Sequence, residues 1–496
     1  MPITQKVPFR KVLVANRGEI AVRIIRALKE LGIRSVAIFS DADKDSLHVL
    51  MADEAYRVGP PDPKLSYLNI EKIVKIAKDC GAEAIHPGYG FLAQSKEFAE
   101  RVTEEGLVFI GPPSKIHEIV SDKLAFKAFL GNHGIPVVPG PFKEIETVDE
   151  ALETAENLGY PVILKPRFGG GGIGMFVCHN ADELKKSFML AARLSDVAFG
   201  KRNLYIEKYY PEAKHIEVQI LADNHNNVIH LFERECSMQR RFQKVLEEAP
   251  SPILDDEKRK RVTSIALRIA RLVNYVNAGT VEFIYVPSED KFYFIELNAR
   301  IQVEHPITEA ITGVDIVKEQ LYIAAGYKLN LSQNEVEIRG HAIEARIYAE
   351  DPRTLSPSPG TIKSYLPPSG PGIRVDSYLY PGVEIPPFYD PLIAKLISWG
   401  ANRSEAIRRL DRALLEFHIT GVKTNIPLHH SILRDPEFIK GTYTTLTLEK
   451  KILANVSEIQ TLSLPIKTTE RPIPLSTGYR VNAWKLSAKL AMLEVD

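Results

Sequence analysis

The first 120 positions alternate between short continuous apolar runs and stretches in which apolar residues recur at helical spacing. Continuous runs are typical of strands buried on both faces, and each helical stretch lies between two such runs. Strands are predicted at 11–15, 36–39, 84–86 and 108–110, and helices at 19–31, 70–79 and 98–105. This order predicts a parallel sheet whose strands are joined by right-handed crossovers.

The next part of the chain has a different pattern, with apolar and polar positions alternating or with runs rich in β-branched and aromatic residues. Strands are predicted at 162–165, 175–178, 204–207, 216–221, 228–232, 280–286 and 292–297, and helices at 122–132, 148–158 and 256–273. Alternation of this kind predicts a mostly antiparallel sheet against which the helices pack.

Proline-rich turns appear after about residue 335, followed by a predicted helix at 404–415 and, after Ile452, by a stretch with little periodicity. A single core stops growing at about 250–300 residues, so a chain of 496 residues needs several units. We expect a first domain at 1–120, a central domain at 121–335, a third at 336–452 and a tail extension at 453–496.

Composition narrows the class of protein. Lysine plus arginine equals aspartate plus glutamate, 63 against 63, which argues against a dedicated nucleic-acid binder. The three cysteines form no CxxC pair, and this sparse use favours a reducing compartment. Neither a signal-peptide pattern nor an apolar run of about 20 residues is present. We therefore expect a cytoplasmic enzyme with no nucleic-acid or membrane partner.

A glycine run at 169–172 lies between two predicted strands. A dinucleotide-binding loop would need a helix after it, and a Walker A loop would need Lys-Ser/Thr where Met175-Phe176 stands. A glycine hairpin remains, whose backbone N–H groups can approach phosphate while Lys165 adds positive charge. The alternative is a flexible turn without a ligand.

Two predicted strands carry acids among apolar neighbours, Glu282 in TVEF and Glu296 in FIELN. Asn298 follows Glu296 by two positions and shares its strand face. Buried carboxylates need a partner, and oxygen ligands of this kind suit Mg²⁺ or Mn²⁺. The alternative is a salt bridge to a nearby arginine.

Polar residues also cluster in two neighbouring segments. Arg300, Gln302 and Glu304 alternate and would share one face if the strand continued, where they could hold a small oxyanion beside a base. The segment 235–244 is a second polar cluster, whose alternatives are a solvated loop or a basic RNA-binding patch. With only three cations it is a poor nucleic-acid stripe.

Seven segments together carry a resemblance to a known family: ANRGEIA (15–21), HPGYGF (86–91), EKYY (207–210), ECSMQRRFQK (235–244), EEAPSP (247–252), RIQVEHP (300–306) and EARI (344–347). From Val12 to about Lys451 the chain resembles the biotin carboxylase subunits of acyl-CoA and pyruvate carboxylases, within the ATP-grasp superfamily. The resemblance implies an α/β and α+β multidomain fold: an N-terminal parallel βαβ domain, a central ATP-grasp domain with a glycine-loop lid at about 137–210, and a C-terminal mixed domain.

The resemblance also implies a role for individual residues. ATP phosphates would meet Lys123, Lys165, Gly170, Gly171 and Gly172. Adenine would meet Glu207, Lys208 and Tyr210, and the ribose His215 and Gln239. Two Mg²⁺ or Mn²⁺ ions would be held by Glu282, Glu296 and Asn298. Bicarbonate would be held by Lys244, Arg300, Gln302 and the Val303 backbone, with Glu304 as the base and Arg346 on the ureido oxygen of biotin.

The implied activity is ATP-dependent carboxylation of biotin by bicarbonate through carboxyphosphate, the first half-reaction of an acetyl-CoA or propionyl-CoA carboxylase or a two-subunit pyruvate carboxylase. A carrier needs Met-Lys-Met around its biotinylated lysine, and no methionine here precedes a lysine. We therefore expect biotin on a separate carrier protein, a further partner in the form of a carboxyltransferase subunit, and a homodimer. The acceptor stays open among acetyl-CoA, propionyl-CoA, pyruvate and 2-oxoglutarate.

Two other functions stay open at this point. One is another ATP-grasp ligase, which would turn over ATP without biotin. The other is a non-catalytic subunit, favoured by two departures from the family pattern. Phe168 stands at a position that is usually flexible, and Phe242 stands where the family usually has a histidine near the ribose.

Overall fold

The computed structural model describes residues 9–167, 174–199 and 203–454. The glycines 170–172 and Phe168 lie outside these ranges, as does most of the predicted tail. Within them, no helix combines the length and the apolar character that crossing a membrane requires. Cys80, Cys178 and Cys236 are buried free thiols.

The N-terminal region is a five-stranded sheet in the order β3-β2-β1-β4-β5, and its strands are parallel as predicted. Its strands are β1 (Lys11–Val14), β2 (Arg34–Ser40), β3 (Glu54–Gly59), β4 (Ala84–His86) and β5 (Val108–Phe109). Its helices are α1 (Gly18–Glu30), α2 (Leu47–Met51), α3 (Ile70–Asp79) and α4 (Lys96–Glu104). Edge strand β3 alternates between exposed and less exposed residues and was not predicted, because its EAYR segment lacks an apolar run.

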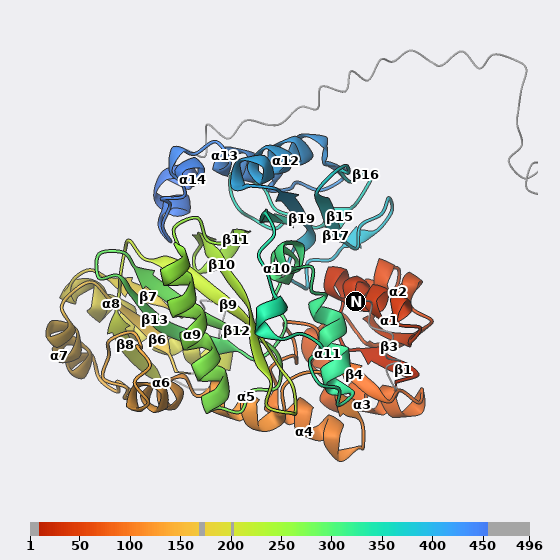
Figure 1. Ribbon diagram of the computed structural model, residues 1–496, viewed down its shortest axis with the longest axis horizontal. Helices are drawn as coiled ribbons and strands as arrows, with labels where there is room; N and C mark the ends of the chain where they lie inside the picture. The colour runs from red at the N-terminus through yellow and green to blue at the C-terminus, as the bar shows by residue number, and fades with distance from the viewer. Residues whose placement is uncertain (1–8, 168–173, 200–202, 455–496) are drawn as a thin grey trace, which may run out of the picture. The chain divides into compact units, whose positions relative to one another are not determined.

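The central feature is an eight-stranded sheet in the order β13-β12-β9-β10-β11-β14-β19-β17, antiparallel throughout (Figure 1). Its strands are β9 (Lys214–Ala222), β10 (Val228–Arg240), β11 (Gln243–Ala249), β12 (Asn277–Val286), β13 (Lys291–Asn298), β14 (His341–Tyr348), β17 (Ile373–Ser377) and β19 (Leu392–Gly400). Strands β14, β17 and β19 come from the region after residue 336 and pair with the strands before it, so the predicted central and third domains share one sheet.

Helices from several parts of the chain pack on this large sheet. They are α5 (Ser114–Ser121), α6 (Lys123–Asn132), α9 (Asp256–Leu272), α10 (His305–Thr312), α11 (Ile316–Ala324), α12 (Arg403–Glu416), α13 (Ile426–Ile432) and α14 (Pro436–Lys440). Of these, α9, α10 and α11 lie between its strands in sequence. Helix α9 runs along the sheet (Figure 1) and shares a core with strands β9 and β12. Asp255 begins α9 by accepting a hydrogen bond from the Lys258 backbone N–H.

A separate small sheet has the order β7-β6-β8 and is antiparallel. It consists of β6 (Val162–Pro166), β7 (Phe176–Cys178) and β8 (Leu204–Lys208), with α7 (Val148–Leu158) and α8 (Ala181–Phe199) packed on it. Strands precede and follow the glycine segment, which confirms the predicted context and excludes a helix directly after it. Two short ribbons complete the fold: β15 (Gly360–Thr361) with β18 (Glu384–Ile385), and β16 (Ser364–Leu366) with β20 (His418–Thr420).

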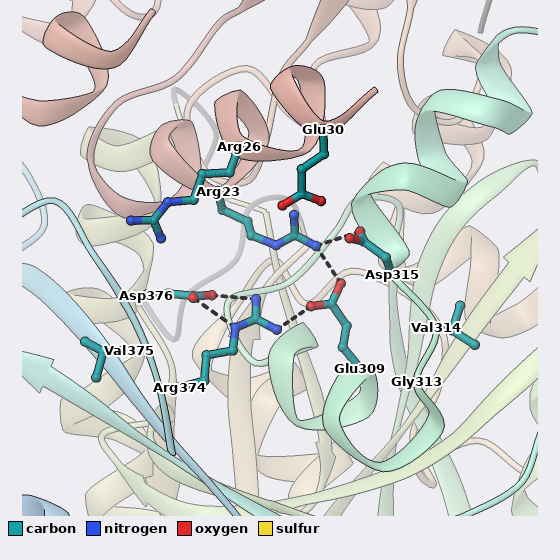
Figure 2. A pocket seen from close by; sticks show the side chains of 10 residues that line it. All are labelled: Arg23, Arg26, Glu30, Glu309, Gly313, Val314, Asp315, Arg374, Val375 and Asp376. Carbon is teal, nitrogen blue, oxygen red and sulfur yellow. Dashed lines mark hydrogen bonds and ion pairs between the residues drawn. The ribbon is translucent and has the colours of Figure 1, made fainter. Parts of the chain in front are cut away.

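Buried and half-buried ion pairs join three parts of the chain around a pocket of about 410 Å³ (Figure 2). Arg23 of α1 donates to Glu309 of α10 at 3.0 Å and to Asp315 at 2.6 Å. From the opposite side, Arg374 of β17 donates to Glu309 at 2.7 Å and pairs with Asp376. Glu309 therefore bridges arginines from the first and last thirds of the chain.

Candidate active site

Three glutamates stand directly opposite one another on adjacent strands of the large sheet. Glu282 on β12 is in register with Glu217 on β9 and with Glu296 on β13. Glu217 and Glu282 are buried, and Glu296 is half-buried. Like charges directly opposite each other destabilise a sheet. This row of carboxylates therefore requires cations close by.

Lys244 on β11 supplies one of those cations. Its Nζ donates to Glu282 Oε1 at 2.9 Å and to Glu304 Oε1 at 2.7 Å, and it also pairs with Glu217. Burial disfavours the charged ammonium, but the three carboxylates hold the pKa of Lys244 well above its usual value. One lysine is thus the common partner of three glutamates.

Glu304 connects this lysine to an arginine on the neighbouring strand. Arg346 on β14 donates from Nη2 to Glu304 Oε2 at 3.0 Å and from Nε to Glu247 Oε1 at 2.5 Å. Burial opposes the ionisation of Glu304, yet Lys244 and Arg346 together hold its pKa well below the usual range. Burial raises the pKa of Glu247 to about 7 against the attraction of Arg346. Glu304 is therefore a fully ionised, buried carboxylate between two cations.

A fully buried arginine beneath this cluster orders several of its members. Arg234 on β10 donates from Nε to Glu217 Oε1 at 2.5 Å and from Nη2 to Gln302 Oε1 at 2.8 Å. Its remaining hydrogen bonds go to Gln219, Thr280 and Thr308. All five N–H groups of the guanidinium have an acceptor. Arg234 therefore fixes which way the Gln302 amide faces.

The segment after β13 is a loop and does not extend the strand. The strand ends at Asn298, and Glu304 is the residue before helix α10, so the condition for a shared strand face of Arg300, Gln302 and Glu304 is not met. The loop still brings amides to the carboxylate row, since the Asn298 and Gln302 side chains donate to Glu282 at 2.8 and 2.7 Å.

The other two predicted bicarbonate ligands lie in the same loop. Arg300 donates to Asn298 Oδ1 at 3.2 Å and to Gln94 Oε1 at 2.9 Å. The Val303 carbonyl accepts from Lys395 Nζ at 2.9 Å, which anchors the loop on β19. The loop after β13 is therefore held at both of these residues.

The polar segment 235–244 is neither a solvated loop nor a basic patch. Strand β10 extends to Arg240, and β11 returns from Gln243, with residues 233–239 buried. Arg241 and Phe242 form the hairpin tip with φ values of 48° and 65°. Two left-handed residues fit a two-residue turn that follows the twist of the strands.

Lysines also pair with Glu296, at one end of the carboxylate row, and with Glu207 on the small sheet. Lys123, the first residue of α6, donates to Glu296 Oε2 at 2.8 Å. Lys165 on β6 donates to Glu207 Oε2 at 2.8 Å, and Lys127 pairs with Glu207 Oε1. The Glu207 carboxylate is thus shared by two ammonium groups.

The remaining predicted nucleotide residues lie on β8, β9, β10 and the loop after β8. Lys208 donates to the Gly159 and Tyr160 carbonyls at 2.7 and 3.2 Å, and the Tyr210 ring stacks on Tyr293. The side chains of His215 and Gln239 lie 3.0 Å from Glu282 Oε2 and 3.2 Å from the Cys236 carbonyl, respectively.

Comparison with known proteins gives one family for most of the chain. Family models match at residues 8–116 (biotin carboxylase, N-terminal domain), 122–332 (carbamoyl-phosphate synthase L chain, ATP binding domain) and 344–450 (biotin carboxylase C-terminal domain). Biotin carboxylase 1 of Bacillus subtilis is 51% identical over 89% of this chain and 98% of its own length. One pyruvate carboxylase subunit of Methanothermobacter thermautotrophicus is 52% identical over 88% of this chain and 89% of its own length. The chain belongs to the biotin carboxylase family.

A solved structure supports the same assignment. The biotin carboxylase domain dimer of Hydrogenobacter thermophilus 2-oxoglutarate carboxylase, in complex with MgADP, ADP and bicarbonate, superposes with a TM-score of 0.88. It is 48% identical, and the match covers 92% of this chain and 99% of that one. The predicted three-part fold of a biotin carboxylase with a central ATP-grasp domain is therefore confirmed.

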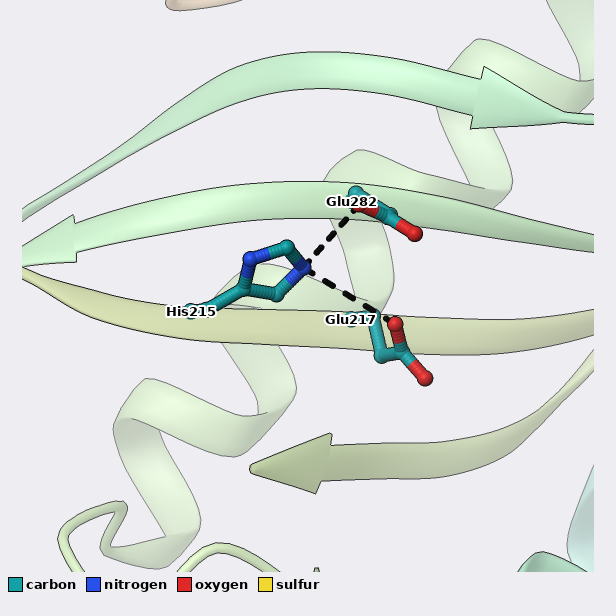
Figure 3. Close-up of side chains that lie close together, drawn as sticks. All are labelled: His215, Glu217 and Glu282. Atoms are coloured by element: carbon teal, nitrogen blue, oxygen red, sulfur yellow. Dashed lines mark ion pairs between the residues drawn. The ribbon is translucent and has the colours of Figure 1, made fainter. Parts of the chain in front are cut away.

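The donor groups at the carboxylate row fit the divalent metal that biotin carboxylases with MgADP imply. His215, Glu217 and Glu282 offer ligand atoms within 4.8 Å of one another, and Figure 3 shows His215 facing both acids. The buried His215 Nε2 makes no hydrogen bond to the described residues, although it lies 3.0 Å from Glu282 Oε2. Carboxylate oxygens at this density suit Mg²⁺ or Mn²⁺.

Four residues that organise this biotin carboxylase site were not predicted: Lys127, Glu217, Arg234 and Glu247. Glu217 carried a usable signal, because it interrupts the apolar strand pattern of HIEVQIL as Glu282 does in TVEF. Arg234 lies in FEREC, where the end of the predicted strand at residue 232 concealed its burial. Lys127 carried the same kind of signal, because it interrupts the apolar pattern of the predicted helix in LAFKAFL.

Proposed function

We propose that this chain uses ATP and bicarbonate to carboxylate biotin on a separate carrier protein, through carboxyphosphate. The observation that carries this proposal is the buried arrangement of Glu304 between Lys244 and Arg346. A base held between two cations suits a reaction that deprotonates one oxyanion and then stabilises negative charge on a second substrate.

Bicarbonate is assigned to the space bounded by Lys244, Arg300, Gln302 and the Val303 backbone N–H. Glu304 takes the bicarbonate proton as the oxygen attacks the γ-phosphate of ATP, and ADP leaves as the bond between the γ-phosphorus and the bridging oxygen breaks. In the described state Lys244 and Arg346 keep Glu304 weakly basic. A bicarbonate ion that shares the Lys244 ammonium would reduce that effect and strengthen the base.

ATP is assigned to the boundary between the two sheets. Lys123 and Lys165 approach its phosphates together with Gly170, Gly171 and Gly172. Glu207, Lys208 and Tyr210 are assigned to the adenine, and His215 and Gln239 to the ribose. Glu282, Glu296 and Asn298 would hold two Mg²⁺ or Mn²⁺ ions, which when bound offset phosphate charge.

Biotin is assigned to Arg346. Carboxyphosphate yields CO₂ and phosphate, and the phosphate takes the proton from N1 of biotin. The Arg346 guanidinium stabilises the negative charge that then develops on the ureido oxygen, and N1 captures CO₂. Glu247 holds Arg346 Nε at 2.5 Å and Glu304 holds its Nη2 at 3.0 Å, so two carboxylates orient the guanidinium.

Partners and organisation are proposed on the strength of the relatives. The M. thermautotrophicus relative is one subunit of a larger enzyme by name, and so is the 2-oxoglutarate carboxylase small subunit of H. thermophilus, 93% of which this chain covers. We propose a homodimer with a cytoplasmic location, a separate carrier and a carboxyltransferase subunit. We propose domain limits at 120, 335 and 452, which lie close to the ends of the three family-model matches.

ADP release by the purified chain with Mg²⁺ and ATP tests this function. The rate is expected to need both bicarbonate and free biotin, and to collapse in Glu304→Gln and Arg346→Ala variants. ATP turnover that ignores biotin while nucleotide binding is intact would instead favour another ATP-grasp ligase. Nucleotide binding without any bicarbonate-dependent turnover would favour a non-catalytic subunit.

A further inference from the structure

Helix α6 presents two lysines one turn apart, and each pairs with a different sheet. Lys123 donates to Glu296 on β13 of the large sheet, at 2.8 Å. Lys127, four residues later on the same helix face, pairs with Glu207 on β8 of the small sheet. The apolar side of α6, with Phe126 and Leu130, belongs to the core of the large sheet. Lys127 therefore links a helix that packs in the core of the large sheet to a strand of the small sheet.

The pair that Lys127 makes is buried at both ends. Lys127 is 1% exposed and Glu207 is 2% exposed, whereas Lys165 on the other side of Glu207 is 13% exposed. A second link between the same parts, Arg167 to Asp122 at 2.9 Å, is far more accessible to solvent. The attraction between two buried charges is weakened less by solvent and salt than that between exposed charges, and their hydrogen bonds fix the geometry of the pair.

We propose that Lys127 is a positioning residue for the nucleotide site, which fixes Glu207 and, through it, the Lys165 ammonium that meets the ATP phosphates. This inference rests on the proposed function of Lys165. With Lys127 in place, Glu207 gives one oxygen to each lysine. Without Lys127, both oxygens would be free to hold Lys165, and the local excess of one positive charge would be lost.

The experiment is MgADP titration by calorimetry on the full-length chain carrying Lys127→Met. Removing the ammonium leaves Glu207 paired with Lys165, so no unpaired buried charge remains. We expect the Kd for MgADP to rise about tenfold, the scale of one charge-assisted contact. Lys143→Met is the matched control, because Lys143 pairs with Glu150 at 2.7 Å on the surface, and its Kd should change less than about twofold.

A double-mutant cycle separates positioning from a general structural effect. If Lys127 acts through Glu207, adding Lys127→Met to Glu207→Gln should weaken MgADP binding no further. Additive losses would overturn the inference, as would an unchanged Kd in Lys127→Met. MgADP binding requires neither bicarbonate nor biotin. Loss of the carboxylation activity in the wild type would therefore count against the proposed function alone.

The wild type offers a second readout that needs no substitution at Lys127. Burial lowers the pKa of Lys127 to about 8 although Glu207 opposes the shift. Burial also opposes ionisation of Glu207, but the two lysines hold its pKa at about 2. The groups facing Lys127 are Glu207, Lys165, Lys123 and the Tyr205 ring. Nucleotide affinity should therefore fall as the pH rises through about 8.

The Glu207→Gln variant tests whether the loss of nucleotide affinity at alkaline pH depends on the pair between Lys127 and Glu207. It removes the acid through which Lys127 acts, so its affinity for MgADP should be lower at neutral pH and nearly flat between about pH 7 and 9. A wild-type affinity that stays constant over this interval would overturn the inference. An equally steep loss in Glu207→Gln would do the same, since the titrating group would then act by another route.

Discussion

The two halves of the active site have opposite charge arrangements. In the half proposed for bicarbonate, one ammonium, that of Lys244, is shared by three carboxylates, two from the large sheet and that of Glu304 from the start of α10. In the nucleotide half, one carboxylate, that of Glu207, is shared by two ammonium groups from different elements. An excess of negative charge suits bound metal ions, and an excess of positive charge suits phosphate. The half to which a polar residue belongs therefore predicts which ligand its loss should affect.

The largest expected effect lies in the bicarbonate half. Glu304→Gln keeps the size of the side chain and removes the base, so bicarbonate-dependent ADP release should fall at least about 100-fold. Steady-state kinetics at saturating ATP would measure it. Glu319→Gln, a buried glutamate on α11 away from the site, should stay within about twofold of wild type. A Glu304→Gln enzyme with near-normal turnover would remove the proposed base.

Arg234→Lys should act selectively on bicarbonate. Lysine has three donors in place of the five that Arg234 uses, so Glu217 and Gln302 lose their common anchor. We expect the KM for bicarbonate to rise about tenfold with little change in the KM for ATP. Arg240→Lys, the same substitution farther along β10 in an ion pair with Glu350, should leave both constants unchanged. Equal increases in both KM values would indicate general destabilisation.

We expect the KM for biotin to depend on pH because of Glu247. Burial raises its pKa to about 7, so the carboxylate that holds Arg346 Nε is protonated below that pH and ionised above it. The KM for biotin should fall about threefold as the pH rises from about 6 to 8, as the ionised fraction increases. A Glu247→Gln variant should lose this dependence. If it retains the wild-type profile, the titrating group lies elsewhere.

The smallest effect is expected at the tip of the hairpin between β10 and β11. Phe242 is 37% exposed, and the turn conformation depends on the backbone of the tip more than on its side chain. Phe242→His, which restores the usual family residue, should change the free energy of unfolding by less than about 0.5 kcal/mol. It should change the KM for ATP less than about threefold. Chemical denaturation and kinetics together measure both, and a large gain in turnover would mean that Phe242 restricts activity in this chain.

Element types followed from the sequence wherever the apolar pattern was regular. The predicted helices at 70–79 and 148–158 coincide with α3 and α7, and the strands of the small sheet were placed within one residue. Strand β14 was not predicted because Glu344 and Arg346 interrupt its pattern, although the whole strand is buried. Polar residues in a buried strand are tolerated only where partners from other strands meet them, and those partners come from distant parts of the sequence.

In the candidate site, too, some contacts follow from local sequence spacing and others depend on the tertiary fold. The shared strand face of Glu296 and Asn298 follows from a spacing of two, and the structure confirms it through Asn298 contacts to Glu282 and Glu296. The meeting of Lys244 with Glu217 depends on strand order, which a local pattern does not specify. The resemblance predicted the residues of the site, and the structure shows which contacts those residues make with one another.

The central claim is that this chain forms carboxybiotin. Incubation with ¹⁴C-bicarbonate, ATP, Mg²⁺ and free biotin, followed by isolation of the biotin, measures that product directly. We predict that label enters biotin only when ATP is present, and that Glu304→Gln and Arg346→Ala each abolish it. ADP release that proceeds while biotin stays unlabelled would contradict the account.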